Sequence, residues 1–145
     1  MKQPMQYSKI GLALTERFEG CRLAAYQDQV GIWTIGYGHT NGVHADMTCT
    51  SEQAQAWLVL DTHEAQDAVN RLLNVDLTQG EFDACVDFVF NLGATAFARS
   101  TMRRLLNAGS MQEAAGQFAL WDHAGGEVVA GLLRRRLAEK AEFLA

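Results

Sequence analysis

Three residues near the start of the chain have the types and the spacing that hydrolysis of a glycosidic bond requires. Glu19 is followed nine positions later by Asp28, and Thr34 comes six positions after that, at the start of a glycine-rich segment. Glycosidases act through a carboxylic acid that protonates the leaving oxygen and a carboxylate that assists from another side of the sugar. The pattern therefore predicts a sugar hydrolase.

Each of the three also has an ordinary structural interpretation. Glu19 precedes Gly20 at a predicted helix end, where it could be a solvated side chain, but the negative end of the helix dipole disfavours a carboxylate there and suits a general acid. Asp28 lies in a turn-forming segment and could simply shape the turn. Thr34 is a typical strand residue, with glycines on its own face that leave room for a water or a sugar.

Length and charge narrow the possible function classes. With 145 residues and 48% hydrophobic side chains, the chain can bury one core, so we expect a single domain over residues 1–145. The 12 Lys and Arg residues against 17 Asp and Glu residues give a net charge of −5. An acidic chain is a poor match for nucleic acid or for an anionic membrane surface, so neither is expected as a partner.

The cysteines and the hydropathy pattern indicate where the chain is made. Cys21, Cys49 and Cys85 lie far apart and lack the spacing of a zinc or redox motif, so we expect reduced thiols in a protein made in a cytosol. The first 20 residues lack the apolar core of a signal peptide, and no apolar run reaches transmembrane length. We therefore expect no stable membrane association.

The positive charges gather near the end of the chain. Residues 46–70 contain five acidic residues and no Lys or Arg, whereas residues 128–145 contain the run Arg134, Arg135 and Arg136. Three consecutive helical residues point in three directions, so at most two can face one site. A solvated face is the ordinary interpretation. The alternative is that Arg134 or Arg135 reaches Glu19 or the substrate, while another arginine pairs with a nearby acid.

The order of periodic segments predicts an α+β fold that is mostly helical. Residues 20–50, rich in glycine with a period of two, should form a small antiparallel sheet lobe, while residues 1–19 and 75–145 should form a helical lobe. A long helix over residues 51–74, capped by Thr50 or Ser51, should link the two lobes.

Apolar spacing and capping motifs predict the remaining helices. The first should run over residues 8–19 and bury a stripe formed by Ile10, Leu14 and Phe18. Thr78 and Glu81 form a capping-box pattern. The later helices are expected over residues 78–92, 101–108, 110–121 and 128–143.

Alternation along the glycine-rich segment predicts one packed and one open face of the sheet. The packed face is expected to carry Trp33, Ile35, Tyr37 and His39. The open face, on which a sugar could lie, is expected to carry Thr34, Gly36, Gly38 and Thr40.

A second polar pair is predicted beside this site. Asp61 falls on the apolar stripe of the long helix and needs a partner if buried, and His39 on the packed face of the sheet is the obvious candidate. Catalysis or zinc binding by His39 is the alternative. His44, Cys49 and His63 lack convincing ligand spacing, so no metal site is expected.

Several motifs taken together resemble those of phage-type lysozymes, glycoside hydrolase family 24. The first is Glu19, eight residues, Asp28, five residues and Thr34, followed by Ile-Gly-x-Gly-His at residues 35–39. The segment 88–93, Phe-Val-Phe-Asn-Leu-Gly, resembles the central-helix motif of the family. The segment 131–139 resembles its C-terminal motif, so the resemblance covers nearly the whole chain.

The resemblance implies a peptidoglycan-binding cleft between a sheet lobe and a helical lobe, in an endolysin of a phage or prophage. By position, Glu19 corresponds to the acid, Asp28 to the base or electrostatic partner, and Thr34 to the group that positions the attacking water. We expect Asn91, Arg134 and Gly36 to contact the sugar, although Asn91 could instead cap the helix end before Gly93. His39 and Asp61 are expected to form a structural pair.

The expected activity is hydrolysis of the β-1,4 bond between N-acetylmuramic acid and N-acetylglucosamine, without metal or cofactor. The chain is expected to be a monomer that waits in the host cytoplasm and reaches the cell wall in the periplasm through a separate membrane pore protein. One rival is a lytic transglycosylase, which needs an acid but no water-activating pair. Another is a non-catalytic peptidoglycan-binding remnant of a prophage.

Overall fold

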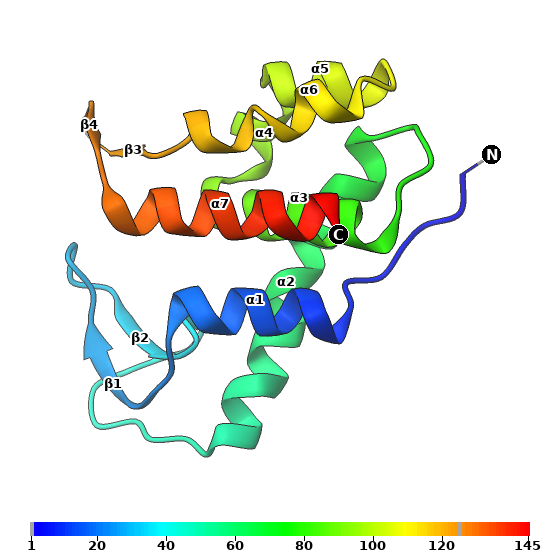
Figure 1. Cartoon of the computed structure of the whole chain (residues 1–145). Coiled ribbons are helices and arrows are strands. Elements are labelled where there is room, and N and C mark those ends of the chain that lie inside the picture. The colour runs from blue at the N-terminus through cyan, green and yellow to red at the C-terminus, as the bar shows by residue number, and fades with distance from the viewer. Residues whose placement is uncertain (1, 125) are drawn as a thin grey trace.

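The longest element, α2 (Ser51–Leu72), connects the first β-hairpin with the cluster of helices (Figure 1). The computed structural model describes residues 2–124 and 126–145. The Thr50 side chain caps α2 by accepting a hydrogen bond from the backbone N–H of Gln53. At 1.5 Å per residue, a helix of 22 residues is about 33 Å long, enough to span both parts of the molecule. The predicted linking helix is present and ends two residues earlier than expected.

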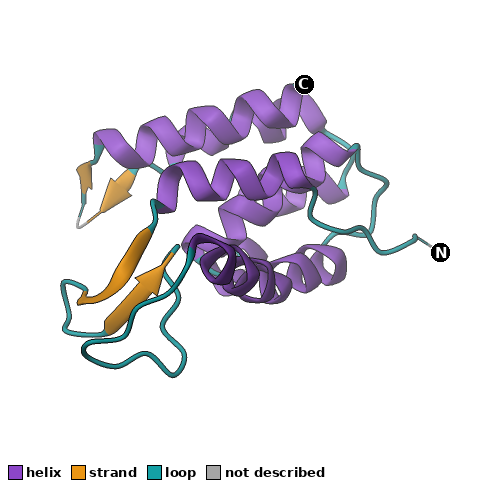
Figure 2. Ribbon diagram, turned by 90° about the horizontal axis from the view of Figure 1, so that it is seen from below, coloured by secondary structure: helices purple, strands orange, loops and turns teal. Residues whose placement is uncertain are grey.

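The other elements surround α2 in two groups, with short strands on one side and helices on the other (Figure 2). In chain order they are α1 (Lys9–Glu19), β1 (Arg22–Gln27), β2 (Trp33–Gly36), α3 (Gln79–Leu92), α4 (Ala94–Ala98), α5 (Thr101–Asn107), α6 (Met111–Ala115), the 3-10 helix η1 (Phe118–Leu120), β3 (His123–Ala124), β4 (Glu127–Val128) and α7 (Ala130–Leu144).

Helix α1 has the predicted bounds but buries a different face. Ser8 caps its start and Gly20, with φ of 69°, ends it. The predicted stripe is wrong at Ile10, which is 66% exposed, whereas Gly11 and Thr15 are the buried residues of α1. The reason is that α1 packs on a polar part of α3. A Cβ at Gly11 would lie 2.9 Å from the carboxyl carbon of Asp83.

Strands β1 and β2 form an antiparallel hairpin in which Tyr26 lies opposite Thr34. The expectation of one open face was wrong at Thr34, which is only 5% exposed, and at Gly36, which is also buried, whereas Gly38 and Thr40 are exposed as expected. A Cβ at Gly36 would lie 3.1 Å from the Cβ of Ala54, so α2 covers this part of the hairpin. Ile35 is fully buried, as the packed face requires.

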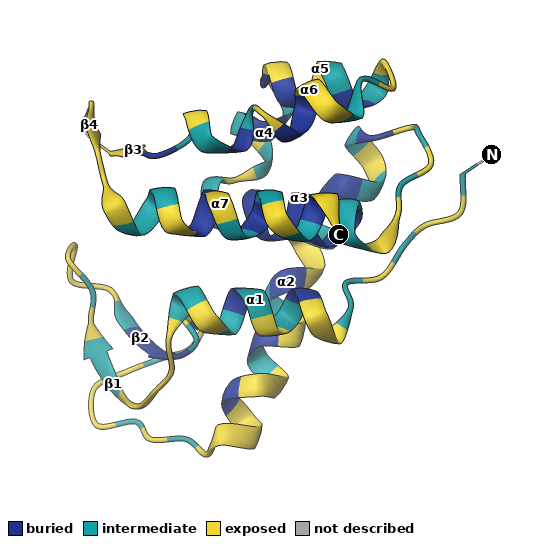
Figure 3. Ribbon diagram, in the orientation of Figure 1, coloured by how far each residue is buried: buried dark blue, intermediate teal, exposed yellow. Residues whose placement is uncertain are grey.

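The hydrophobic core lies among the helices and centres on α3 (Figure 3). Phe88 of α3 makes edge-to-face contacts with Phe97, Phe118 and Trp121, with ring centroids 5.9, 5.8 and 5.4 Å away. Such aromatic contacts add to the stabilisation from burial. The predicted capping box at the start of α3 is present, formed by Thr78 and Glu81.

The end of the helical lobe differs from the sequence prediction in two places. The helix expected over residues 110–121 ends at Ala115, and η1 follows as a separate turn. Ser110 makes no side-chain capping hydrogen bond. The last helix begins at Ala130 and not at Val128, because residues 127–128 form strand β4, which pairs antiparallel with β3 at residues 123–124.

None of the helices in the described parts of the chain combines the length and the apolar character needed to cross a bilayer. Cys21, Cys49 and Cys85 are all free thiols, of which Cys85 is fully buried.

Candidate active site

Glu19 occupies the last position of α1, and its two carboxylate oxygens have different surroundings. Oε2 accepts a hydrogen bond from Nη1 of Arg135 at 2.6 Å. Oε1 faces the backbone of Gly38, where a Cβ would lie only 3.1 Å away. The Glu19 side chain is 23% exposed. One oxygen is thus fixed by a cation, and the other lies beside a glycine that leaves space around it.

Arg135 of α7 is held on its other side by Asp87 of α3. Its Nε donates to Oδ2 of Asp87 at 2.9 Å and its Nη2 donates to Oδ1 at 2.8 Å, a two-point contact. Arg135 is 5% exposed. A bidentate contact of this kind fixes the plane of the guanidinium group. The direction in which Arg135 presents Nη1 to Glu19 is therefore set by α3.

A buried network of polar side chains supports the contact between Arg135 and Asp87. Thr15 Oγ1 donates to Oδ1 of Asp87 at 2.7 Å, and the hydroxyl groups of Tyr7 and Thr15 lie 2.7 Å apart. Burial by itself would raise the pKa of Asp87, but hydrogen bonds from Glu139 and Arg135 outweigh it and hold that pKa below its usual value. Asp87 is therefore the charged partner of Arg135.

Glu139 completes the network one turn further along α7. It is fully buried and contacts Arg136 of the same helix, with Nη2 of Arg136 donating to Oε2 of Glu139 at 2.8 Å. Burial, together with the neighbouring Asp87, raises the pKa of Glu139 well above its usual value. Arg136, whose Nε lies 2.6 Å from Oε1 of Glu139, acts against this rise in pKa, but burial and Asp87 outweigh it.

Sequence reasoning missed Asp87, Thr15, Tyr7 and Glu139 as members of the site. A signal was present in the spacing, because Gly11 and Thr15 are small or polar residues four positions apart in one helix. Asp83 and Asp87 are acidic residues four positions apart in another, otherwise apolar helix. Residues with this spacing share one helix face. The polar groups on two such faces can form hydrogen bonds with each other only if the two helices pack together.

Asp28 and Thr34 are linked through a single residue, Ile32. Asp28 Oδ1 accepts hydrogen bonds from the backbone N–H groups of Val30 and Ile32, both at 2.9 Å. The Thr34 hydroxyl donates to the backbone carbonyl of Ile32 at 3.0 Å. Because the hydroxyl proton of Thr34 is used in this bond, the Thr34 oxygen is left to accept a hydrogen bond from a water. The turn therefore fixes the position of the Asp28 carboxylate relative to the Thr34 hydroxyl.

His39 and Asp61 lie together, as the sequence led us to expect. Nδ1 of His39 is 2.8 Å from Oδ2 of Asp61, and the imidazole stacks on the ring of Trp57 with 4.5 Å between centroids and 6° between planes. Trp57 and Asp61 are one turn apart on α2, so the pair attaches the end of the hairpin to the linking helix. The histidine is bound on two sides by protein groups.

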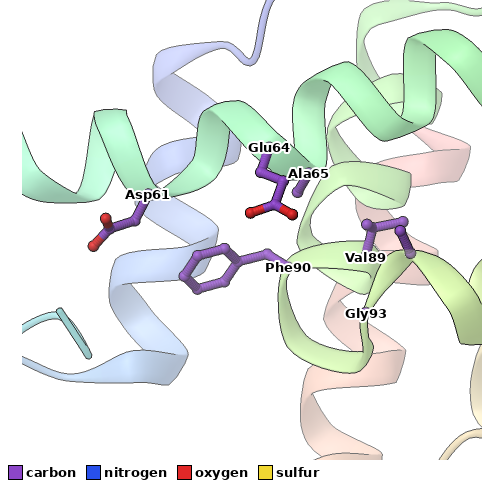
Figure 4. A pocket seen from close by; sticks show the side chains of 7 residues that line it. Asp61, Glu64, Ala65, Val89, Phe90 and Gly93 are labelled. Carbon is purple, nitrogen blue, oxygen red and sulfur yellow. The ribbon is translucent and has the colours of Figure 1, made fainter. Parts of the chain in front are cut away.

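A hollow of about 280 Å³ lies where α2 meets the end of α3. Phe90 points from α3 towards α2, with Asp61 and Glu64 on the opposite wall (Figure 4). Glu19, Asp28 and Thr34 are not part of its lining. The neighbouring Asn91 is half-buried, and its Oδ1 atom is buried without a hydrogen-bond partner in the described structure. Buried acceptors are normally hydrogen-bonded to protein or to an ordered water, so this oxygen is an exception within the described structure.

The remaining predicted contacts lie apart from one another. The Arg134 side chain is exposed on the first turns of α7, while Arg135 and Arg136 are buried, so the interpretation of the arginine run as a solvated face holds only for Arg134. Gly36 is packed against Ala54 and offers at most its backbone to a ligand. Within residues 2–124 and 126–145, no group of three His, Cys, Asp or Glu residues is placed to hold a metal ion.

The carboxyl group at the end of α1, held by α7, and the aspartate and hydroxyl fixed in the hairpin are the kinds of group that a lysozyme-type glycoside hydrolase requires. Comparisons with known proteins agree with this class. Residues 16–139 match the family model described as phage lysozyme.

Relatives match over nearly the whole chain. The endolysin of Acyrthosiphon pisum secondary endosymbiont phage 1 is 43% identical over 143 residues, which cover 96% of this chain and 98% of that protein. A solved mutant of the lysozyme from phage P22 is 42% identical with a TM-score of 0.90, covering 97% of this chain and 99% of the other. The muramidase domain of SpmX from Asticaccaulis excentricus is 41% identical with a TM-score of 0.91, covering 97% and 98%. The chain belongs to the phage lysozyme family.

Proposed function

We propose that the chain is an endolysin that hydrolyses the β-1,4 bond between N-acetylmuramic acid and N-acetylglucosamine in peptidoglycan, with Glu19 as the general acid. The family membership and the muramidase and endolysin relatives support the substrate class. The observation that carries the role of Glu19 is its unequal environment, with Oε2 bound to Arg135 and Oε1 next to Gly38. An acid must present one oxygen to the leaving group while its orientation is held, and this arrangement does both.

Asp28 and Thr34 are proposed to act on the attacking water. The Thr34 oxygen can only accept, because its proton is given to the Ile32 carbonyl, and a water that donates to it would be held by one of its hydrogens. The carboxylate of Asp28 uses Oδ1 for the two turn N–H groups, which leaves Oδ2 to take the second hydrogen or to stabilise positive charge on the sugar. The shared attachment to Ile32 supports a joint role.

Three further residues are proposed to contact the glycan. Asn91 is supported by its buried, unpartnered Oδ1. Arg134 is supported by its exposed side chain on the turn of α7 that precedes Arg135. Gly36 has the weakest support, since it is buried against Ala54 and only its backbone could take part. The His39–Asp61 pair is proposed to be structural.

The proposed biological setting is lysis of a bacterial host. The chain would act as a monomer on the cell wall, after passage from the host cytoplasm to the periplasm through a pore formed by another protein. Other members of the family are named SAR-endolysins, for example that of bacteriophage PS119, which is 35% identical over 123 residues. No metal or cofactor is required by the proposed chemistry.

Digestion of purified peptidoglycan sacculi tests the proposal. The chain should release soluble fragments, and the Glu19→Gln variant should not, although it folds. If the sacculi stay intact in the presence of the unaltered chain, the proposed enzymatic activity is rejected and a binding module is favoured. Full activity of a folded Glu19→Gln variant would remove Glu19 from the role of acid.

A further inference from the structure

Four arginines gather where α2 ends, on the part of the helical lobe that lies away from the β1–β2 hairpin (Figure 1). They are Arg71 in the last turn of α2, Arg99 directly after α4, and Arg103 and Arg104 in α5. Nε of Arg103 donates to the backbone carbonyl of Leu72 at 3.0 Å, which joins α5 to the end of α2. Nη1 of Arg104 donates to the carbonyl of Arg99 at 3.4 Å. We call these four arginines the basic end.

The basic end is only partly offset by acidic residues. None of its arginines forms an ion pair with another residue in the parts of the chain that the structure describes. Asp67 lies one turn before Arg71 on α2, and Asp76 lies near Lys2, whose Nζ atom donates to the carbonyl of Leu73 at 2.8 Å. Residues 94–112, by contrast, contain three of the four arginines and no Asp or Glu.

Helix capping accounts for only part of this cluster. The helix dipole stabilises cations at the C-terminal end of a helix, and Arg103 and Lys2 donate directly to the last carbonyls of α2. Arg71, Arg99 and Arg104 are exposed instead, so their charges face the solvent. Guanidinium groups stay ionised at any ordinary pH. The cluster therefore presents a permanent positive charge to a partner.

The net charge of −5 does not decide what the basic end attracts. Exposed charges are screened beyond about 8 Å at physiological ionic strength. The 22 residues of α2 span about 33 Å, so the acidic side chains at its hairpin end are several screening lengths away. The local field at the basic end is set by the arginines, which favours an anionic partner there.

The composition of this end favours a surface of charged groups over a strand or an apolar partner. Residues 70–76 and 94–112 carry no large exposed apolar side chain, so nothing here would insert into a hydrophobic phase. Phe97 is the aromatic residue of these two segments and is fully buried, so no ring is available to stack on the bases of a nucleic acid strand. A hollow of about 430 Å³ lies nearby, but its lining includes Arg71 and none of the other three arginines.

We propose that the basic end binds the phosphate headgroups of an anionic phospholipid membrane, peripherally and reversibly. Guanidinium groups pair with phosphate through two parallel hydrogen bonds, and clusters of basic residues are attracted to anionic lipid surfaces. Gly36 of the hairpin packs on Ala54 in the first turn of α2, whereas Arg71 is in its last turn. A chain held at its basic end would therefore direct the hairpin away from the lipid. This binding goes beyond the proposed hydrolysis and does not depend on it.

The test measures how the chain partitions onto sedimented vesicles of phosphatidylglycerol and phosphatidylcholine, compared with vesicles of phosphatidylcholine alone. The unaltered chain should bind the first kind and not the second, and added salt should release it. Each arginine near an anionic surface contributes about 5-fold to binding, so Arg99→Gln/Arg104→Gln should lower the partition coefficient by about 25-fold. Arg17→Gln/Arg22→Gln is the matched control, because it removes the same charge from exposed arginines next to the hairpin, and it should keep the partition coefficient.

Thermal unfolding of both double variants shows whether they fold, and the lipid and salt comparisons use the unaltered chain alone. Failure of the unaltered chain to bind vesicles that contain phosphatidylglycerol would overturn the proposal. A loss of equal size in the two double variants would also overturn it, because binding would then follow net charge. Soluble inorganic polyphosphate that displaces the chain as well as an equal amount of lipid phosphate would assign the surface to a phosphate polymer. Cleavage of lipid-free glycan strands, measured separately, tests the proposed function without affecting the vesicle result.

Discussion

Arg135 and Glu19 are 116 positions apart in the chain, yet Nη1 of Arg135 donates to Oε2 of Glu19 at 2.6 Å. The same guanidinium is fixed by two hydrogen bonds to Asp87. The orientation of Glu19 is thus determined by α7 and, through Asp87, by α3, while its Oε1 atom faces Gly38, two residues after the end of β2.

Replacement of Glu19 by Gln should abolish most of the activity, because the amide keeps the shape of the side chain but cannot donate a proton to the leaving oxygen. Loss of general acid catalysis lowers rates by about 10² to 10⁴. Initial rates on soluble glycan strands measure the effect. Glu16→Gln, on the same helix, serves as the control and should retain normal rates.

Thr34→Val should lower turnover sharply, whereas Thr34→Ser should preserve much of it. Valine keeps the β-branched shape but removes the oxygen that we propose to hold the water, while serine keeps that oxygen. Comparison of kcat for the two folded variants checks the role. Equal kcat values in Thr34→Val and the unaltered chain would show that the hydroxyl does not position the water.

Gly38→Ala should impair catalysis beyond its effect on folding. Gly38 has φ of 85°, and an added Cβ would lie 3.1 Å from Oε1 of Glu19. Gly42 is the matched control, since its φ of 73° imposes a similar backbone strain but a Cβ there would have no described heavy atom within 4 Å. Both substitutions should destabilise the fold by about 1–2 kcal/mol.

Only Gly38→Ala should also reduce kcat, when the two variants are compared at a temperature where both are folded. A similar kcat in the two variants would mean that the space beside Oε1 of Glu19 is not used in the reaction.

The stability of the chain should depend on pH through Glu139. Its folded-state pKa lies well above the value of about 4.3 expected in the unfolded chain, so the folded state retains a proton that the unfolded state releases. The stabilisation from protonated Glu139 is fully present below the unfolded pKa and is lost as pH rises towards the folded pKa. Glu139→Gln removes this dependence.

Urea unfolding of both proteins across this pH range measures the difference. The free energy of unfolding of the unaltered chain should fall relative to Glu139→Gln, by at most about 1.4 kcal/mol per pH unit. Parallel curves of stability against pH would contradict the raised pKa of Glu139.

The sequence was enough to nominate the candidate catalytic residues, whose roles stay predictions, but it did not show which residues hold Glu19 in place. Glu19, Asp28 and Thr34 fall within 16 consecutive residues, so local spacing was enough to group them. The hydrogen-bond partner of Glu19 comes from α7 and is held in turn by Asp87 of α3. Only tertiary packing could select Arg135 from three consecutive arginines. Successive helical residues point about 100° apart, so one residue of difference changes the face.

The wrong predictions share a physical origin. Apolar periodicity placed Ile10 in the core, but α1 packs on the side of α3 that carries Asp83 and Asp87, so its polar face is the buried one. Alternation placed Thr34 and Gly36 on an open face, but α2 covers the end of the hairpin. In both cases a pattern that describes one element could not show what lies against it.

The most direct test of the central claim is the chemistry of the new chain ends. Peptidoglycan should be digested in water enriched in heavy oxygen, and the fragments should be analysed by mass spectrometry. A water held by Thr34 and Asp28 should appear as heavy oxygen at reducing N-acetylmuramic acid ends. Ends made of 1,6-anhydromuramic acid, which would be unlabelled and lighter by one water, would contradict hydrolysis. Reducing N-acetylglucosamine ends would contradict the bond that we assign.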